Sequence, residues 1–229
     1  MSFELIADKP KSLRDRAACE ARRSQLNARH IAPLAEFVQQ LREQVPNGII
    51  PDFDPWDGGT DAEILYLLEA PGAKAGASGF ISRNNPDETA KNFFELNLSA
   101  GIARKRTVCW NAVPWYIGSG TKIRAATSSD IAEGLKPLFN LLRLLPNLRA
   151  VVLIGRKAEY TAKEIARQKP DLKIFKSPHP SPMYCNRAPG NRENILNVLH
   201  QVAKFVGPAV QQGAPADRFA SASLRQNGG

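Results

Sequence analysis

The sequence predicts an α/β fold: a central, mostly parallel sheet of four strands with helices on both faces. Four short apolar runs, each followed at once by a polar residue, glycine or proline, are typical of strands buried on both faces. They span residues 64–68, 107–110, 150–154 and 172–175. Segments with helical spacing of apolar residues separate these runs, and such alternation favours parallel strands covered by helices.

The chain before the first strand is expected to form an N-terminal extension of helix and loop. Residues 12–29 are rich in arginine, alanine, glutamate and leucine, and apolar residues between positions 31 and 41 recur at helical spacing. Residues 49–60 contain two prolines, several aspartates and a Gly-Gly pair. This composition predicts an irregular connection beside the core, and such loops often border functional sites.

Four further helices are predicted where apolar residues return every three or four positions. They cover residues 87–99, 129–145, 157–169 and 192–205. From residue 207 to 229 the chain is rich in Gly, Pro, Ala, Gln and Ser without periodic apolar positions, which predicts a disordered tail. We therefore expect one domain over residues 1–206, of which residues 1–60 are the extension.

Composition and charge restrict the class of protein before any motif is considered. The 229 residues are 43% hydrophobic and 23% charged, which is typical of a globular protein, and no apolar run approaches the roughly 20 residues that cross a bilayer. The three cysteines are far apart and form no Cys-x-x-Cys pair, so the spacing indicates neither a disulfide framework nor a metal site. We expect a cytoplasmic protein without a membrane partner. The net charge of +9 fits a polyanionic partner, but equally a solvated basic surface.

Polar turns with chemically useful residues follow three of the four predicted strands. Glu69-Ala70-Pro71-Gly72 follows the first, Asn111 follows the second, and the run from Ser177 to Pro182, centred on His179, follows the fourth. Parallel strands bring their carboxyl ends to one edge of the sheet, where ligands bind in open α/β folds.

Taken together and in this order, these turns resemble the motifs of the uracil-DNA glycosylase superfamily. The first is similar to its Glu-Ala-Pro-Gly motif A, the last to its His-Pro-Ser-Pro motif, and Asn111 lies where the superfamily has its base-reading asparagine. The resemblance covers roughly residues 64–205. It implies a three-layer sandwich and a DNA repair enzyme that flips uracil from DNA and hydrolyses its N-glycosidic bond.

The resemblance also assigns roles to individual residues. His179 would donate a hydrogen bond to uracil O2, where negative charge collects as the base leaves. The amide of Asn111 offers an acceptor and a donor side by side, which fits N3–H and O4 of uracil and opposes the reversed pattern of cytosine. Phe80 would stack on the flipped base. Each residue taken alone also has an ordinary structural explanation. His179 could be a loop histidine with its own hydrogen-bond partner, Asn111 a turn residue, and Phe80 part of the core.

Motif A departs from the best-known members of the superfamily at two positions. Ala70 stands where they carry a water-activating Asp, and Gly72 replaces the Tyr that excludes the thymine methyl group. Glu69 is the nearest carboxylate and is our expected water-positioning group, with Asp87 or an aspartate of the 52–61 loop as alternatives. Backbone N–H groups near Ala70 and Gly72 would hold the water or O2. The four cluster cysteines of the iron–sulfur class are absent from the sequence, and we expect no metal and no cofactor.

Contacts to DNA are expected from basic loops around the motifs. Met183 or Tyr184 would fill the gap left by the flipped nucleotide, in the loop that begins at Ser181. Arg187 and Arg192, together with Lys122 and Arg124, would neutralise phosphates, although a solvated surface is about as common a fate for any one basic residue.

The sequence thus predicts a monomeric, monofunctional glycosylase that leaves an abasic site. No lysine falls at a motif position, so lyase chemistry is not expected. The first alternative is a nucleic-acid-binding protein on the same scaffold without turnover, for which Ala70 is the main argument. The second is a metal-dependent phosphoesterase that uses His179 with aspartates of the 52–61 loop. The range of damaged bases and the preference for single or double strands stay open.

Overall fold

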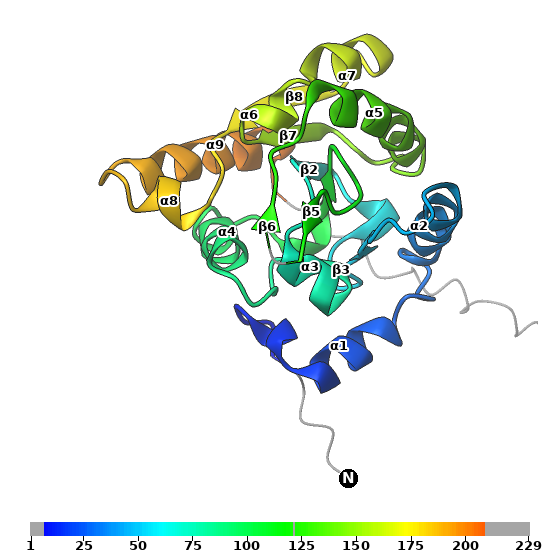
Figure 1. The fold of residues 1–229 in the computed structure, drawn as a ribbon. Coiled ribbons are helices and arrows are strands. Elements are labelled where there is room, and N and C mark those ends of the chain that lie inside the picture. Colours follow the sequence, from blue (N-terminus) through cyan, green and yellow to red (C-terminus); the bar gives the residue numbers. More distant parts are fainter. Residues whose placement is uncertain (1–6, 121, 209–229) are drawn as a thin grey trace, which may run out of the picture.

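A computed structural model of the chain describes residues 7–120 and 122–208. Its centre is a four-stranded sheet in the order β4, β2, β7, β8, in which every neighbouring pair is parallel (Figure 1). The strands are β2 (Ile64–Leu68), β4 (Thr107–Asn111), β7 (Ala150–Ile154) and β8 (Lys173–Ser177). All four predicted strands are confirmed within one or two residues.

Helices cover both faces of this sheet, as predicted. On one face lie α4 (Glu88–Ser99) and α9 (Asn191–Val206), which contact each other, and α9 also contacts β8. On the other face lie α2 (Ala32–Gln44) and α5 (Ser128–Arg143), which contact each other as well. Figure 1 shows these two layers on either side of the strands.

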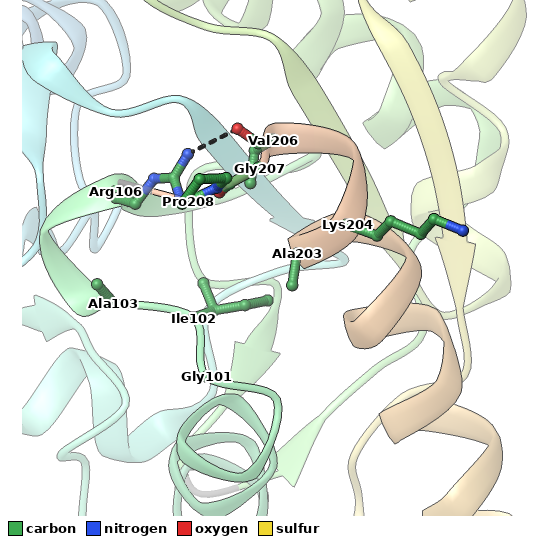
Figure 2. A pocket seen from close by; sticks show the side chains of 9 residues that line it. All are labelled: Gly101, Ile102, Ala103, Arg106, Ala203, Lys204, Val206, Gly207 and Pro208. Atoms are coloured by element: carbon green, nitrogen blue, oxygen red, sulfur yellow. Dashed lines mark hydrogen bonds between the residues drawn. The ribbon is translucent and has the colours of Figure 1, made fainter. Parts of the chain in front are cut away.

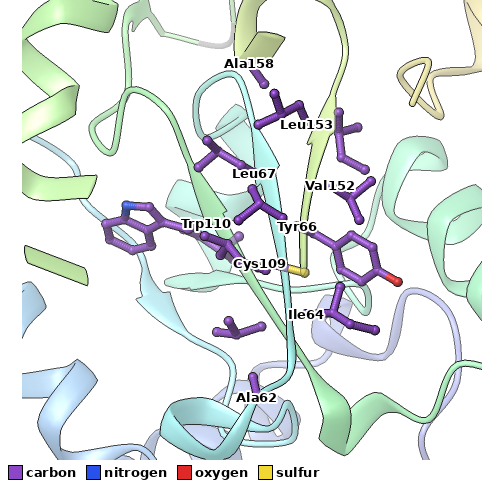
Figure 3. Close-up of a cluster of buried hydrophobic side chains, with 14 of the residues drawn as sticks. Ala62, Ile64, Tyr66, Leu67, Cys109, Trp110, Val152, Leu153 and Ala158 are labelled. Carbon is purple, nitrogen blue, oxygen red and sulfur yellow. The ribbon is translucent and has the colours of Figure 1, made fainter. Parts of the chain in front are cut away.

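Strand side chains that alternate between the two faces build the core (Figure 3). Tyr66 of β2 faces α4, where its ring meets Phe93 edge-on at a centroid distance of 4.7 Å and its hydroxyl donates to Asn97 Oδ1 over 2.6 Å. Trp110 of β4 faces the other layer and stacks on Phe53 at 4.3 Å. Both central strands are buried on two sides, which explains their continuous apolar sequence.

The N-terminal extension is less helical than predicted. Residues 12–29 form a single 3₁₀ turn (Ser12–Arg14) and the short helix α1 (Arg16–Arg23), which ends before a series of turns. The 49–60 connection contains a two-residue strand, β1 (Asp52–Phe53), paired in parallel with β3 (Phe80–Ile81), and a 3₁₀ turn (Gly59–Asp61).

A buried cluster of charges attaches this extension to the domain. Asp54 lies at its centre: one carboxylate oxygen accepts from Arg22, and the other accepts from Ser82 and, over 2.6 Å, from Arg104 Nη2. The guanidinium of Arg22 also lies 3.5 Å from the centroid of the Trp56 ring. The side chains of Arg22 and Asp54 are only 1% and 0% exposed, so the extension is part of the folded core.

Two other predictions of local structure need correction. The segment 157–169 is not one helix but two, α6 (Arg156–Glu159) and α7 (Ala162–Gln168), separated by a turn at Tyr160 and Thr161. The sequence analysis also missed α3 (Ala73–Ser78), α8 (Pro182–Cys185) and the hairpin of β5 (Gly118–Ser119) with β6 (Lys122–Ile123). These short elements surround the site described below. Of the predicted tail, residues 209–229 lie outside the described residues.

One cavity, of about 380 Å³, lies between residues 101–106 and the end of α9 (Figure 2). Arg106 lines this cavity, and its guanidinium donates hydrogen bonds to the carbonyls of Val206 and Gly207 and to the carboxylate of Glu63. Arg106 precedes β4, so this cavity lies at the amino ends of the strands, away from the three motifs. Among the described residues, no helix is both long and apolar enough to span a membrane.

Candidate active site

The three motif turns meet at the carboxyl ends of the strands, as the parallel sheet requires. They line a cavity of about 750 Å³ that is much larger than the one beside α9. Five of the six residues predicted for catalysis and base binding lie in its wall together: Glu69, Ala70, Gly72, Asn111 and His179. Three strands, β2, β4 and β8, therefore each supply part of one site.

Asn111 supplies the wall of the cavity with an amide that the protein leaves free. It is the last residue of β4, paired in register with Leu68 of β2, and it is 3% exposed. Its Nδ2 is buried and has no hydrogen-bond partner among the described residues. A buried amide nitrogen without a partner costs roughly 1–3 kcal/mol, so its natural complement is a ligand with a hydrogen-bond acceptor.

His179 follows β8 after Ser177 and Pro178 and faces the same cavity. Burial lowers the pKa of its imidazole, while the negative charges of Glu69 and Asp87 act in the opposite direction without cancelling that effect. The neutral ring is therefore favoured near pH 7. Gly155, at φ +82°, allows the close approach of the β7 turn, since a Cβ there would lie 3.3 Å from His179 Cβ.

Glu69 holds the backbone of a neighbouring segment and also lines the cavity. Its Oε1 accepts a hydrogen bond from the backbone N–H of Ala126 over 2.7 Å, which connects the end of β2 to the chain that returns from the β5–β6 hairpin. Its other oxygen accepts no hydrogen bond among the described residues, and Glu69 lines the cavity. Asp87, the alternative carboxylate, also lines the cavity, but it caps α4 by accepting from Ala90 N over 2.8 Å.

The aspartates of the 52–61 loop do not reach the site, which corrects the alternative that assigned them a role there. Asp54 and Asp57 are 1% exposed and pair with arginines of the buried charge cluster, and neither lines the cavity. They are therefore unavailable to His179 for phosphoester chemistry. Within the described ranges, no group of three or more His, Cys, Asp or Glu side chains is arranged to hold a metal ion.

The position of Phe80 does not support its predicted stacking role. Neighbouring residues of a strand point to opposite sides, and in β3 it is Ile81 that lines the cavity. Phe80 is fully buried, is not part of the cavity wall, and its ring lies 5.7 Å from the guanidinium of Arg23. The aromatic residue in the wall is Phe93 of α4, to which the sequence assigned no role in the site.

Gly72 and Ala70 leave room on the motif A side. A Cβ added to Gly72 would meet no atom within 4 Å, so the cavity is open where a bulkier residue would narrow it. Ala70 packs against a small apolar cluster at the base of the hairpin. No carboxylate replaces the one that the resemblance would place there, which leaves Glu69 as the nearest acid.

The polar residues of the cavity wall that the sequence did not indicate are Lys74, Ser82, Arg83, Asn85 and Thr89. Ser82, Arg83 and Asn85 follow β3, a two-residue strand too short to produce a periodic signal, and Lys74 lies on the short helix α3. Arg83 donates to Thr107 Oγ1 over 2.8 Å and pairs with Asp57 at 3.4 Å, which joins the cavity wall to the buried charge cluster.

The residues predicted to contact DNA differ in their freedom to do so. Met183 on α8 is 83% exposed and Arg187 is exposed, so both are accessible to a partner. Ser181 caps α8 by accepting from Tyr184 N, and Tyr184 itself is half-buried against the core. Arg192 donates to Asn92 Oδ1 and, over 2.6 Å, to Glu95 Oε2 of α4, so its charge is already compensated.

The same contrast divides the two basic residues of the hairpin segment. Lys122 is exposed and makes no side-chain hydrogen bond or ion pair among the described residues. Arg124 lines the cavity, yet both terminal nitrogens donate to the carboxylate of Asp130, at 2.6 and 2.8 Å. Of the four predicted phosphate-binding cations, Arg124 and Arg192 are paired, whereas Lys122 and Arg187 make no side-chain hydrogen bond or ion pair within residues 7–120 and 122–208.

The parallel α/β sheet, with an amide, an imidazole and a carboxylate around one strand-end cavity, has the arrangement that the resemblance to DNA glycosylases predicts. The chain belongs to the uracil DNA glycosylase superfamily, whose sequence model matches residues 55–202. No curated protein sequence matches the chain significantly.

Three solved structures are similar to this chain, and the first of them supports the fold. The crystal structure of SMUG2 from Pedobacter heparinus superposes with a TM-score of 0.52 at 13% identity, covering 78% of this chain and 86% of that one. A solution NMR structure from Methanosarcina acetivorans, with a provisional uracil DNA glycosylase assignment, matches at 18% identity and a TM-score of 0.43, covering 62% and 92%. A mimivirus UNG variant in complex with UGI matches at 12% identity and a TM-score of 0.35, covering 80% and 74%.

Proposed function

We propose that this protein is a monofunctional uracil-DNA glycosylase that binds uracil-containing DNA as a monomer and releases free uracil. The observation that carries this proposal is the free amide of Asn111 in a cavity shared with His179 and Glu69. A nucleobase in this cavity would supply the acceptor that Asn111 Nδ2 lacks. Superfamily membership provides the chemical class, and the side chains provide the specificity.

Recognition depends on the hydrogen-bond pattern of the base. The amide nitrogen of Asn111 donates to O4 of uracil, and its oxygen accepts from N3–H. Cytosine presents a donor at position 4 and an acceptor at position 3, so both contacts become mismatched. Each buried mismatch costs roughly 1–3 kcal/mol, which is enough to discriminate the two bases. The open space beside Gly72 leaves C5 unscreened, so discrimination rests on this amide.

Bond cleavage transfers negative charge to the departing base. As the bond between C1′ and N1 breaks, the electron pair goes to uracil, and His179 donates a hydrogen bond to O2, where this charge collects. A neutral imidazole provides this donor without needing a proton from solvent, which agrees with its lowered pKa. A fixed donor at such a position is typically worth about 10²–10³ in rate.

Water completes the reaction at the sugar. The free oxygen of Glu69 orients a water whose oxygen bonds to C1′, one of its protons is lost, and the uracil anion takes up a proton in solution. Because the sugar is positively charged in the transition state, the Glu69 carboxylate also stabilises it electrostatically. The products are an abasic site and free uracil, with atoms and charge balanced.

The test is a single-turnover excision assay in EDTA with a labelled uracil-containing oligonucleotide, alkaline cleavage of the product, and a parallel gel-shift. We expect cleavage at the uracil position, reduced about 10²-fold or more in Asn111→Ala and His179→Ala. Asn140→Ala and His200→Ala are matched controls because both side chains are exposed on helices, away from the cavity.

The outcomes separate the alternatives. A uracil-dependent gel-shift without cleavage would replace the enzyme by a binding protein on the same scaffold, as the absence of a carboxylate at Ala70 would allow. Cleavage that is unchanged in both site variants would contradict the assignment of these two residues.

A further inference from the structure

An apolar side chain, Ile123, stands at the rim of the candidate active site on the β5–β6 hairpin. It is 47% exposed and at the same time lines the cavity, together with Arg124 and Ala125. An isolated exposed isoleucine on a surface needs no explanation, but this one lies at the opening where a flipped nucleotide would enter.

The base of the hairpin packs against the rest of the domain. Val113, Ile117, Ala126 and Ile131 form a separate small core under it, and Ala70 of motif A packs against this core. At its entry, the N–H of Tyr116 donates to the carbonyl of Ile49 over 2.9 Å. The exposed position of Ile123 is therefore imposed by a folded support.

Two carboxylates fasten the chain where it leaves the hairpin. Glu69 accepts from the backbone N–H of Ala126 over 2.7 Å, and Asp130 binds both terminal nitrogens of Arg124. Asp130 also completes a capping box with Thr127 at the start of α5. The hairpin is thus connected directly to the residue that we assign to water positioning.

The sheet order separates this hairpin from Met183, the exposed apolar residue that we expect to contact DNA. Met183 lies on α8, which follows β8 in the chain, and Ile123 lies on β6, which follows β4. These strands are the two edges of the sheet in the order β4, β2, β7, β8. The two residues therefore belong to connections that leave opposite edges of the sheet, and of the two only Ile123 lines the cavity.

We propose that Ile123 is a second residue that contacts the DNA duplex, packing against the base pair beside the extruded nucleotide, on the opposite side from Met183. This proposal rests on the proposed function and concerns how the same site engages double-stranded DNA. Base surfaces exposed by extrusion are apolar and flat, and apolar side chains fill such gaps in other DNA-bending proteins. The neighbouring Lys122 is exposed and free to meet a phosphate, which favours nucleic acid as the occupant.

The test compares Ile123→Ser with Leu98→Ser, using uracil in duplex and in single-stranded DNA. Leu98 is the matched control because it is 73% exposed on α4 and does not line the cavity. Burial of one isoleucine against a partner corresponds to roughly tenfold in an equilibrium constant. We expect Ile123→Ser to lower kcat/KM about tenfold on duplex DNA and less than about twofold on single strands. Leu98→Ser should change neither, and Ile123→Leu should retain duplex activity.

A second readout keeps the inference independent of catalysis. Binding to a duplex that carries a stable tetrahydrofuran abasic analogue should weaken about tenfold in Ile123→Ser and stay unchanged in Leu98→Ser. Equal losses on duplex and single strands, or unchanged affinity for the abasic duplex, would overturn the role of Ile123. Absence of uracil release by the wild-type protein would instead overturn the proposed function, while the binding comparison would still decide for or against Ile123.

Discussion

Polar side chains are buried in two regions of this molecule, and the two regions differ in the partners of these side chains. In the charge cluster under the N-terminal extension, Asp54 and Asp57 each bind at least one arginine, and Arg22 and Arg104 are engaged in turn. In the strand-end cavity, Asn111 Nδ2 has no partner among the described residues, and Glu69 uses one oxygen for a backbone N–H. Asp57 Oδ2 and Arg83 Nε of the cluster also lack a partner among those residues, so an unpaired atom alone does not mark a site. The difference is that the carboxylates of the cluster lie outside the cavity wall, whereas Asn111 and Glu69 line it.

The electrostatics of Asp54 illustrate the paired region. Burial alone would raise the pKa of its carboxyl group, but the positive charges of Arg104 and Arg22 outweigh burial and keep this pKa below its ordinary value. The carboxylate is therefore ionised in the folded protein at neutral pH. Its loss would leave two buried guanidinium groups without their central counter-charge.

The largest effect is expected from removing that counter-charge. Asp54→Ala should lower the free energy of unfolding by about 3–5 kcal/mol, because one partner of a buried ion pair is then left uncompensated. Urea denaturation followed by circular dichroism measures this loss. Asp61→Ala is the control, since Asp61 pairs with the 91% exposed Arg29 at 3.5 Å and its loss should cost less than about 1 kcal/mol. Similar losses in both variants would show that the cluster does not hold the extension.

The pairing of charges in this cluster could not be predicted from the sequence. Aspartates in the 52–61 loop are visible in the sequence, and their partners Arg22 and Arg104 are too, but they lie 32 and 50 positions away from Asp54. Nothing local indicates which charges will meet. The loop was therefore considered as a source of catalytic acids, although its carboxylates serve folding.

Strands and motifs were predictable for physical reasons that do not apply elsewhere. Runs such as 64–68 and 150–154 are apolar because they are buried on both faces, so composition alone reveals them. Parallel pairing then brings Glu69, Asn111 and His179 to one edge. Phe80 and Ile81 show the limit of this reasoning, because in a two-residue strand no alternation reveals which of the two side chains faces the cavity.

The contrast between paired and unpaired groups extends to the cations at the rim of the site. Lys122 is free, whereas Arg124 is bound to Asp130. A free cation that contacts a phosphate contributes about 0.9 to the slope of log K against log salt concentration. Lys122→Ala should therefore reduce the slope for duplex binding by about one, and Arg124→Ala should reduce it by less. Fluorescence anisotropy at several salt concentrations measures both slopes, and equal reductions would mean that Asp130 does not compensate Arg124.

The smallest effect concerns the imidazole of His179. Burial lowers its pKa below 6.5, and the charges of Glu69 and Asp87 limit that decrease. Glu69→Gln removes one of these negative charges and should lower the pKa of His179 further, while the glutamine oxygen can still accept from Ala126 N. Titration of the imidazole resonances by NMR measures this shift, with His200→Ala as an aid to assignment.

The sign of the accompanying stability change follows from proton binding. Because the pKa of His179 is lower in the folded state, the unfolded chain binds more protons as the pH falls below about 6.5. The free energy of unfolding should therefore decrease on acidification from pH 6.5 down to the folded pKa, and His179 should contribute no pH dependence above that range. In Glu69→Gln, the pH range over which the free energy of unfolding decreases should extend to lower pH. A folded-state midpoint at or above 6.5 in the wild-type protein would contradict the lowered pKa of His179. A midpoint well above 7 would also contradict its role as a donor that carries no charge before the base departs.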